Sequence, residues 1–255
     1  MRALVALVLV ATACAAPPDG ATAAGAGGGR ADRGRLAEQQ SAERQDTVRQ
    51  GAVRLSAELV SPTDVELRWT AGDPAAAGHV LEFATEPQGR YTILAFLPED
   101  QTAYTHPDLI PNTTFFYRLR PYYGHASAPV EVTLGSGPYP EPEPDWSRPR
   151  TIPGGPRGGL PAGTEAAAPA DLKATVTQAD GVAFGWTDRA ADEEGHLLEN
   201  RPAGRPDYRV VAALDPDVNA VGLITLPEER QASYRVRAFR YGPHSNVVHR
   251  TTGGG

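Results

Sequence analysis

Residues 64–69 read Asp-Val-Glu-Leu-Arg-Trp, and residues 181–186, which lie 117 positions later, read Gly-Val-Ala-Phe-Gly-Trp. Each tryptophan is followed 48 positions later by a second matching stretch, Tyr-Arg-Leu-Arg at 117–120 and Tyr-Arg-Val-Arg at 234–237. An internal repeat with a fixed offset sets the architecture before any local pattern is considered. The sequence therefore predicts two similar domains.

The two copies stay in register over a long stretch. Residues 55–122 align with the second copy at a constant offset, so that Tyr91 matches Tyr208, and one added residue later brings Ser127 opposite Ser245. A chain of 255 residues has room for two such domains, each with its own core.

The hydrophobic pattern inside each copy has a period of two. Val65, Leu67 and Trp69 alternate with Glu66 and Arg68, which is typical of a half-buried antiparallel strand. Proline, glycine and asparagine mark turns between stretches of this kind. About seven short strands per copy predict an all-β chain made of two β-sandwiches.

These motifs resemble the fibronectin type III domain, an immunoglobulin-like β-sandwich. In that family the second strand ends in a buried tryptophan, as at Trp69 and Trp186, and a leucine precedes a turn into a strand that ends Tyr-Arg-Val-Arg. The resemblance covers roughly residues 52–135 and 168–252. It implies two modules of the kind that serve as spacers or adhesive domains.

The resemblance also implies a difference between the modules. The family's corner tyrosine falls at Phe115 in the first copy and at Ala232 in the second, and neither residue has the hydroxyl that bonds the backbone. The second domain is therefore expected to be the less stable, with an irregular turn at 227–230.

The expected organisation runs from an exported N-terminus to a short tail. It comprises a signal peptide with a lipobox-like Cys14 (1–16), a disordered tether (17–50), domain 1 (51–135), a Pro/Gly-rich linker (136–167), domain 2 (168–252) and a tail (253–255).

The N-terminus carries the export signal. One arginine and a short apolar run precede small residues, and the run is too short to span a membrane. The only cysteine, Cys14, follows Ala11-Thr12-Ala13, which resembles the bacterial lipobox with alanine where leucine is usual. We expect lipidation of Cys14; the alternative is plain cleavage after Ala13 or Ala15 and release into the medium.

The segments around the domains are poor in large apolar residues. Residues 17–50 cannot bury enough surface to offset the entropy of ordering them. Alternating prolines in the linker favour an extended polyproline segment, and glycines after them favour flexibility, so that the two sandwiches are expected to share no rigid interface. Trp146 in the linker either packs back onto a domain or contacts a partner.

The sequence offers little chemistry. A net charge of −7 argues against nucleic-acid binding, and the histidine spacing predicts no metal site and no cofactor. His79 and His196 match each other and are interpreted as amphipathic strand residues. The acids at 192–194 and 228–229 are expected to be solvated, and no motif of a hydrolase or phosphate-binding enzyme is present, which predicts a non-catalytic protein.

Arginines recur on the strands that end the repeat motif. They are expected to form cross-strand charge pairs with Glu66 and Arg68, with a basic binding stripe as the alternative; they are Arg118, Arg120, Arg235 and Arg237.

The loop between the last two strands is a candidate binding element, because it is a common recognition site in this fold. Plain turn chemistry is the favoured interpretation of its residues, and a loop-mediated contact is the alternative. The candidate residues are Tyr122, Tyr123, His125, Tyr241 and His244.

Two functions remain open on these grounds. The first is a cell-surface or secreted protein whose modules act as spacers or bind an unknown protein, attached to the membrane through an N-terminal lipid. The second is a secreted carbohydrate-associated module that binds a polysaccharide through exposed aromatic residues, for which the candidates are Tyr122, Tyr123, Tyr139 and Trp146.

Overall fold

The computed structural model describes residues 53–70, 72–140, 145–152 and 159–254. Cys14, the signal peptide and the tether lie outside these residues. Within the described residues, no helix has both the length and the apolar character that crossing a bilayer requires.

Strands dominate both repeats. The first repeat contains β1 (Leu55–Leu59), β2 (Val65–Trp69), β3 (Gly78–Ala84), β4 (Thr92–Leu97), β5 (Ala103–His106), β6 (Thr114–Tyr123) and β7 (Val130–Thr133). The second contains β8 (Ala170–Gln178), β9 (Gly181–Thr187), β10 (Gly195–Pro202), β11 (Arg209–Leu214), β12 (Ala220–Ile224), β13 (Gln231–Tyr241) and β14 (Val248–Thr251). Two short 3₁₀ helices, η1 (Glu165–Ala167) and η2 (Pro227–Glu229), precede β8 and β13.

Each repeat places three strands in one sheet and three in another. The first repeat has β1-β2-β5 against β4-β3-β6, and the second has β8-β9-β12 against β11-β10-β13. In β2 the burial alternates as the sequence predicts, with Val65, Leu67 and Trp69 inside. The predicted all-β class and the two sandwiches are confirmed.

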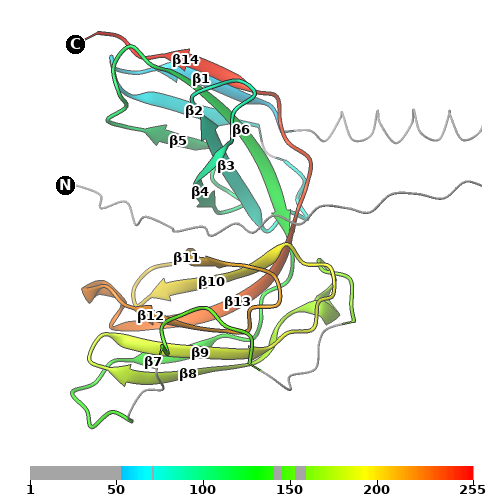
Figure 1. Cartoon of the computed structure of the whole chain (residues 1–255), viewed down its shortest axis with the longest axis vertical. Helices are drawn as coiled ribbons and strands as arrows, with labels where there is room; N and C mark the ends of the chain where they lie inside the picture. Colours follow the sequence, from blue (N-terminus) through cyan, green and yellow to red (C-terminus); the bar gives the residue numbers. More distant parts are fainter. Residues whose placement is uncertain (1–52, 71, 141–144, 153–158, 255) are drawn as a thin grey trace, which may run out of the picture. The chain divides into compact units, whose positions relative to one another are not determined.

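The last strand of each repeat does not join its own sandwich. Strand β7 pairs with β13, with Val130 opposite Tyr234, and β14 pairs with β6, with Val248 opposite Tyr117. Figure 1 shows β14, in red, beside the strands of the first repeat, and β7, in green, beside those of the second. The two repeats therefore exchange their final strands.

The exchange extends into the hydrophobic cores. Val132 and Leu134 of the first repeat are buried in the core of the second sandwich, together with Trp186 and Tyr234. Val248 of the second repeat packs against the core of the first. Each core is thus completed by side chains of the other repeat.

A third apolar cluster joins the two sandwiches. Strands β6 and β13 pair at their ends, and Val80, Tyr122, Leu197 and Phe239 are buried together there. The expectation that the sandwiches share no interface is wrong, because the strands and the core continue from one repeat into the other.

Residues 146–150 of the linker lie on the second sandwich. The indole of Trp146 covers Gly181 of β9 and Gly222 of β12, where a β-carbon would come within 2.7 and 2.3 Å of the ring. Arg150 exchanges backbone hydrogen bonds with Ala220 and so extends the edge of β12. Trp146 therefore packs back onto a domain.

The turn at 227–230 is ordered by a buried carboxylate. Pro227–Glu229 forms η2, and the Glu229 carboxylate accepts hydrogen bonds from the Leu226 backbone, the Asn200 amide and the Arg209 guanidinium at 2.7–2.8 Å. The expectation that the acids at 228–229 are both solvated is wrong for Glu229, which is buried.

Candidate functional site at the strand crossover

Two short segments carry the chain from one sandwich to the other, at 124–129 and at 242–247. Ser127 donates its backbone N–H to Val236 O at 2.7 Å, and its hydroxyl accepts from Val236 N at 3.1 Å. Ser245 makes the same two contacts with Leu119, at 2.7 and 3.0 Å. The matched serines thus pin each crossing segment to a strand of the other repeat.

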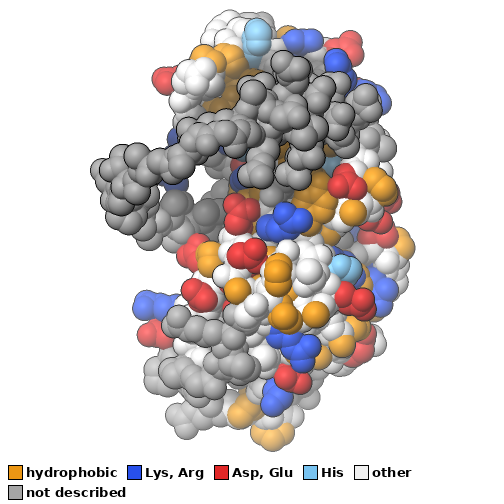
Figure 2. Space-filling model, turned by 90° about the vertical axis from the view of Figure 1, so that its right-hand side faces the viewer, with side chains coloured by type: hydrophobic (Ala, Val, Ile, Leu, Met, Phe, Trp, Pro, Cys, Tyr) orange, Lys and Arg blue, Asp and Glu red, His pale blue; other side chains and the backbone are white. Residues whose placement is uncertain are grey.

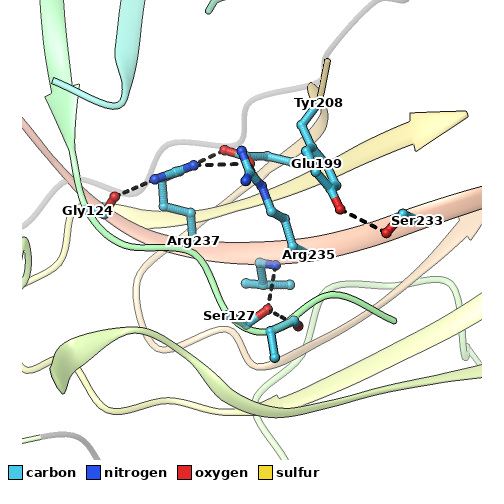
Figure 3. A network of polar contacts seen from close by, with 9 residues as sticks. Gly124, Ser127, Glu199, Tyr208, Ser233, Arg235 and Arg237 are labelled. Atoms are coloured by element: carbon cyan, nitrogen blue, oxygen red, sulfur yellow. Dashed lines mark hydrogen bonds and ion pairs between the residues drawn. The ribbon is translucent and has the colours of Figure 1, made fainter. Parts of the chain in front are cut away.

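A buried carboxylate neutralises two arginines beside the first crossing. Glu199 on β10 bonds Arg235 and Arg237 on β13, and Figure 3 shows both guanidinium groups turned toward it. Arg237 also donates to Gly124 O, and the ring of Tyr208 lies 3.9 Å from the Arg235 guanidinium carbon. Through Arg237, the charge cluster therefore contacts the crossing segment at Gly124 as well as joining β10 to β13.

The second crossing has the matching cluster. Glu82 on β3 bonds Arg118 at 2.6 Å and Arg120 at 2.9 Å, and His244 lies 3.2 Å from the same carboxylate. The Arg120 guanidinium stacks on the ring of Tyr241 at 3.3 Å. Since the four arginines pair with these glutamates, the expected cross-strand pairs exist.

The partners of those pairs differ from the expected ones. Glu66 and Arg68 bond each other at 2.8 Å on the exposed face of β2. The arginines pair instead with a glutamate on the neighbouring strand of their own sheet, on β3 beside β6 and on β10 beside β13, which spacing along one strand does not reveal.

The five candidate loop residues all lie at the crossover, in different surroundings. Tyr122 is 3% exposed and belongs to the shared core. Tyr123 is half-buried and donates to Asp73 at 3.1 Å, while His125 is exposed. Burial raises the pKa of Tyr241 to about 12, against the opposing effect of Arg120. His244 has a lowered pKa, first from burial and then from Arg118, which outweigh the attraction of Glu82.

The crossover segments of both repeats line one pocket. The pocket has a volume of about 780 Å³ and is bordered by Tyr123 and His125 of the first repeat and by Arg240, Tyr241 and Pro243 of the second. A second pocket of about 450 Å³ lies beside Glu199 and Tyr208. The larger one brings together three of the five residues that the sequence singles out.

The interpretation of His79 and His196 as amphipathic strand residues is wrong. Both imidazoles are buried against the tryptophan of their own repeat, with ring centroids 6.2 Å apart for Trp69–His79 and 5.6 Å for Trp186–His196. Desolvation lowers the pKa of His79. The strand begins inside the sandwich, so its first side chain already faces the core.

The surface charges are mixed. On the face shown in Figure 2, acidic and basic side chains are interspersed with small apolar areas. That distribution on this face differs from the clustered positive charge of a nucleic-acid-binding surface.

No family model matches the chain, and no curated protein matches it significantly. The solved structures that are similar include the following three. A fibronectin type III-like protein from Clostridium thermocellum is 28% identical over 26% of this chain and 69% of that one, with a TM-score of 0.24. A two-domain fibronectin type III segment of chicken tenascin is 15% identical over 78% of this chain and 97% of that one, with a TM-score of 0.27. A computer-redesigned β-sandwich protein is 20% identical over 27% and 72%, with a TM-score of 0.24.

Each sandwich has a fibronectin type III-like fold. The assignment rests on the strand order, with the first, second and fifth strands of each repeat in one sheet and the fourth, third and sixth in the other. The exchanged last strand takes the remaining edge beside the sixth.

Proposed function

We propose that this chain is an exported, non-catalytic protein, anchored to the cell envelope by a lipid on Cys14, whose two sandwiches act as one spacer and protein-binding unit. The observation that carries the proposal is the strand exchange, which places the crossover segments of both repeats around one pocket. The binding unit is then the pair of repeats rather than either repeat alone.

The composition of the pocket favours a protein partner. Tyr123, Tyr241 and Arg240 are of the residue types that carry most binding energy at protein interfaces. The Arg240 guanidinium lies 5.5 Å from the ring of Tyr123, and the Arg120 guanidinium stacks on the ring of Tyr241 at 3.3 Å. These aromatic rings are thus fixed in place before a partner binds, which lowers the entropic cost of binding.

A carbohydrate-binding role has less support. Of its four aromatic candidates, Tyr122 is buried in the shared core and Trp146 lies against the second sandwich. Polysaccharide recognition through a row of exposed rings would have to use Tyr123 and Tyr139 alone.

The anchor is tested by labelling cells with a fatty acid. We expect label in the wild-type protein and none in Cys14→Ser, which should be released or mislocalised. Unlabelled wild-type protein in the medium would remove the anchor from the proposal and leave the binding unit as a secreted protein.

The binding unit is tested on intact cells with a photo-crosslinking amino acid at His125, which is exposed at the pocket, and at Lys173, which is exposed on β8 away from it. We expect a discrete protein adduct at position 125 only, lost when Arg240→Glu is added. Equal adducts at both positions, or none at 125, would contradict the proposal. Retention on insoluble polysaccharide that Arg240→Glu abolishes would favour the carbohydrate role instead.

A further inference from the structure

Three carboxylates converge on two loops of the second repeat. Asp188 and Glu193 lie on the loop between β9 and β10, and Asp217 lies on the loop between β11 and β12. One oxygen of each carboxylate lies within 4.8 Å of the others. Asp188 is 7% exposed and Glu193 is 8% exposed, so two of the three are largely removed from water.

The charges of this acidic cluster are poorly compensated. Backbone N–H groups donate to two of them, Ala190 to Asp188 at 3.1 Å and Asp217 to Glu193 at 3.2 Å. Among the described residues, the one basic side chain at ion-pair distance from the cluster is His196. Like charges this close and this buried repel one another unless a cation or a proton intervenes.

His196 is the second observation that points to a ligand. Its side chain is fully buried, and neither ring nitrogen has a hydrogen-bond partner among the described residues. Its Nε2 lies 3.5 Å from Asp188 Oδ1, so the imidazole faces the cluster from the inside without completing a hydrogen bond. Carboxylates that bind metals commonly accept a hydrogen bond from an outer partner, and this is the place that His196 occupies.

The first repeat serves as an internal reference. It has Ala71 and Ala76 at the positions of Asp188 and Glu193, and only Asp100 matches Asp217. His79 is buried without a hydrogen-bond partner in the first repeat too, but among the described residues no carboxylate lies at ion-pair distance from it, whereas His196 lies 3.5 Å from Asp188. The carboxylates are particular to the second repeat, and the sandwich forms without them.

We propose that Asp188, Glu193 and Asp217 bind one Ca²⁺ ion, with His196 as a positioning residue behind Asp188. The three side chains offer oxygen atoms only, which suits a hard cation, and ligands on two loops fit the flexible geometry that Ca²⁺ accepts more readily than Mg²⁺ does. Ca²⁺ sites of extracellular modules have dissociation constants on the order of 10⁻⁴–10⁻³ M. The ion would join the two loops and offset the repulsion within the cluster.

The test is calorimetric titration of the full-length, chelator-treated protein with CaCl₂, MgCl₂ and ZnCl₂, paired with thermal melting in each salt. We expect one Ca²⁺ per chain, weaker binding of Mg²⁺, and a melting temperature that rises by several degrees at a Ca²⁺ concentration about tenfold above the dissociation constant. No Ca²⁺ binding by the wild-type protein at 10⁻² M would overturn the proposal.

Two variants and a matched control make the test specific. Glu193→Gln and Asp217→Asn should each weaken Ca²⁺ binding at least about tenfold. Glu193→Gln should also raise the melting temperature of the Ca²⁺-free protein, because it removes a buried like charge, and this shows that the variant folds. Asp100→Asn, at the matching position of the first repeat, should bind as wild type does.

Other outcomes would count against the site. Unchanged binding in Glu193→Gln and Asp217→Asn would place the ion elsewhere. Tight Zn²⁺ binding that His196→Ala abolishes would contradict an oxygen-only Ca²⁺ site, because the imidazole would then be a ligand.

Discussion

Val248, the first residue of the last strand, lies opposite Tyr117 in the sandwich of the first repeat. In the matching pair, Val130 of the first repeat lies opposite Tyr234 in the sandwich of the second repeat. Neither sandwich is therefore complete unless both repeats are folded. This dependence distinguishes the molecule from two independently folding domains joined by a flexible linker.

Core damage in one repeat should therefore unfold both. Replacing Trp69, which is buried in the first core, by alanine is expected to cost about 3–5 kcal/mol. Scanning calorimetry should show one transition at a lower temperature, because the second core depends on Val132 and Leu134 of the first repeat. Trp69→Phe should be milder, since the buried indole N–H has no partner to lose. Two transitions, one of them at the wild-type temperature, would show independent domains.

The buried charge clusters should matter far more than the exposed pair. Glu199→Gln leaves two arginines, one of them largely buried, without their carboxylate and is expected to cost about 3–5 kcal/mol. Glu66→Gln breaks an exposed pair and should cost about 1 kcal/mol or less. Urea unfolding of the two variants measures the difference. Equal effects would mean that the Glu199 cluster does not hold the crossing segment.

Stability should fall in mild acid. Burial lowers the pKa of His79 below its ordinary value, so in the folded state the imidazole stays neutral while the unfolded chain takes up a proton near pH 6.5. The free energy of unfolding then decreases as the pH falls below about 6.5, by up to ~1.4 kcal/mol per pH unit for each such histidine. His106 and His244 shift in the same direction. Denaturation at pH 7.5 and 5.5 should show a smaller loss in His79→Leu than in wild type; an identical loss would contradict this assignment.

The docking of Trp146 can be tested from the strand beneath it. A β-carbon at Gly222 would come within 2.3 Å of the indole, so Gly222→Ala should displace the ring into water and shift its fluorescence to the red. Gly159→Ala is the control, because a β-carbon there meets no atom within 4 Å. An unchanged spectrum in Gly222→Ala would mean that the linker does not rest on β9 and β12.

The sequence predicts the sandwiches well because their information is local. Alternation in β2 and the paired tryptophans specify which face is buried, and the repeat specifies the number of sandwiches. The burial of His79 does not follow from the sequence, because alternation shows which residues share a face and not where the strand enters the core.

The strand exchange could not be predicted, for a reason that lies in the repeat itself. Residues 130–133 and 248–251 match each other, and so do β6 and β13, so either last strand fits either partner in the same register. Local pattern is identical for the exchanged and the unexchanged arrangements. The choice depends on the path of the crossing segments, where Ser127 and Ser245 bond the other repeat.

The candidate sites also differ in whether neighbouring residues in the sequence reveal them. Aromatic residues near Gly124 and Gly242 indicate a candidate site at the crossover, and the structure brings Tyr123, His125 and Tyr241 to one pocket. The expectation that the acids at 192–194 are solvated is wrong for Glu193, which is buried beside Asp217 of a separate loop, and the expectation of no metal site rests on histidine spacing alone. Only folding brings those oxygens together.

The most direct measurement of the exchange is a disulfide trap in a Cys14→Ser background. Thr114 and Thr251 are directly opposite on β6 and β14, with hydroxyl oxygens 2.8 Å apart, which suits a cross-strand disulfide. The comparison pair is Thr114 with Thr133, because Thr133 would occupy the place of Thr251 if the first repeat kept its own last strand; here it lies opposite Gln231.

A protease site inserted between Gly154 and Gly155 allows the monomer to be cut into an N-terminal and a C-terminal fragment. A non-reducing denaturing gel then shows whether a disulfide joins the two fragments. For Thr114→Cys/Thr251→Cys, the two fragments should stay covalently joined after cleavage, while Thr114→Cys/Thr133→Cys should form no bridge. A bridge in the second variant, with fragments that separate in the first, would show that each repeat keeps its own strand and would contradict the account.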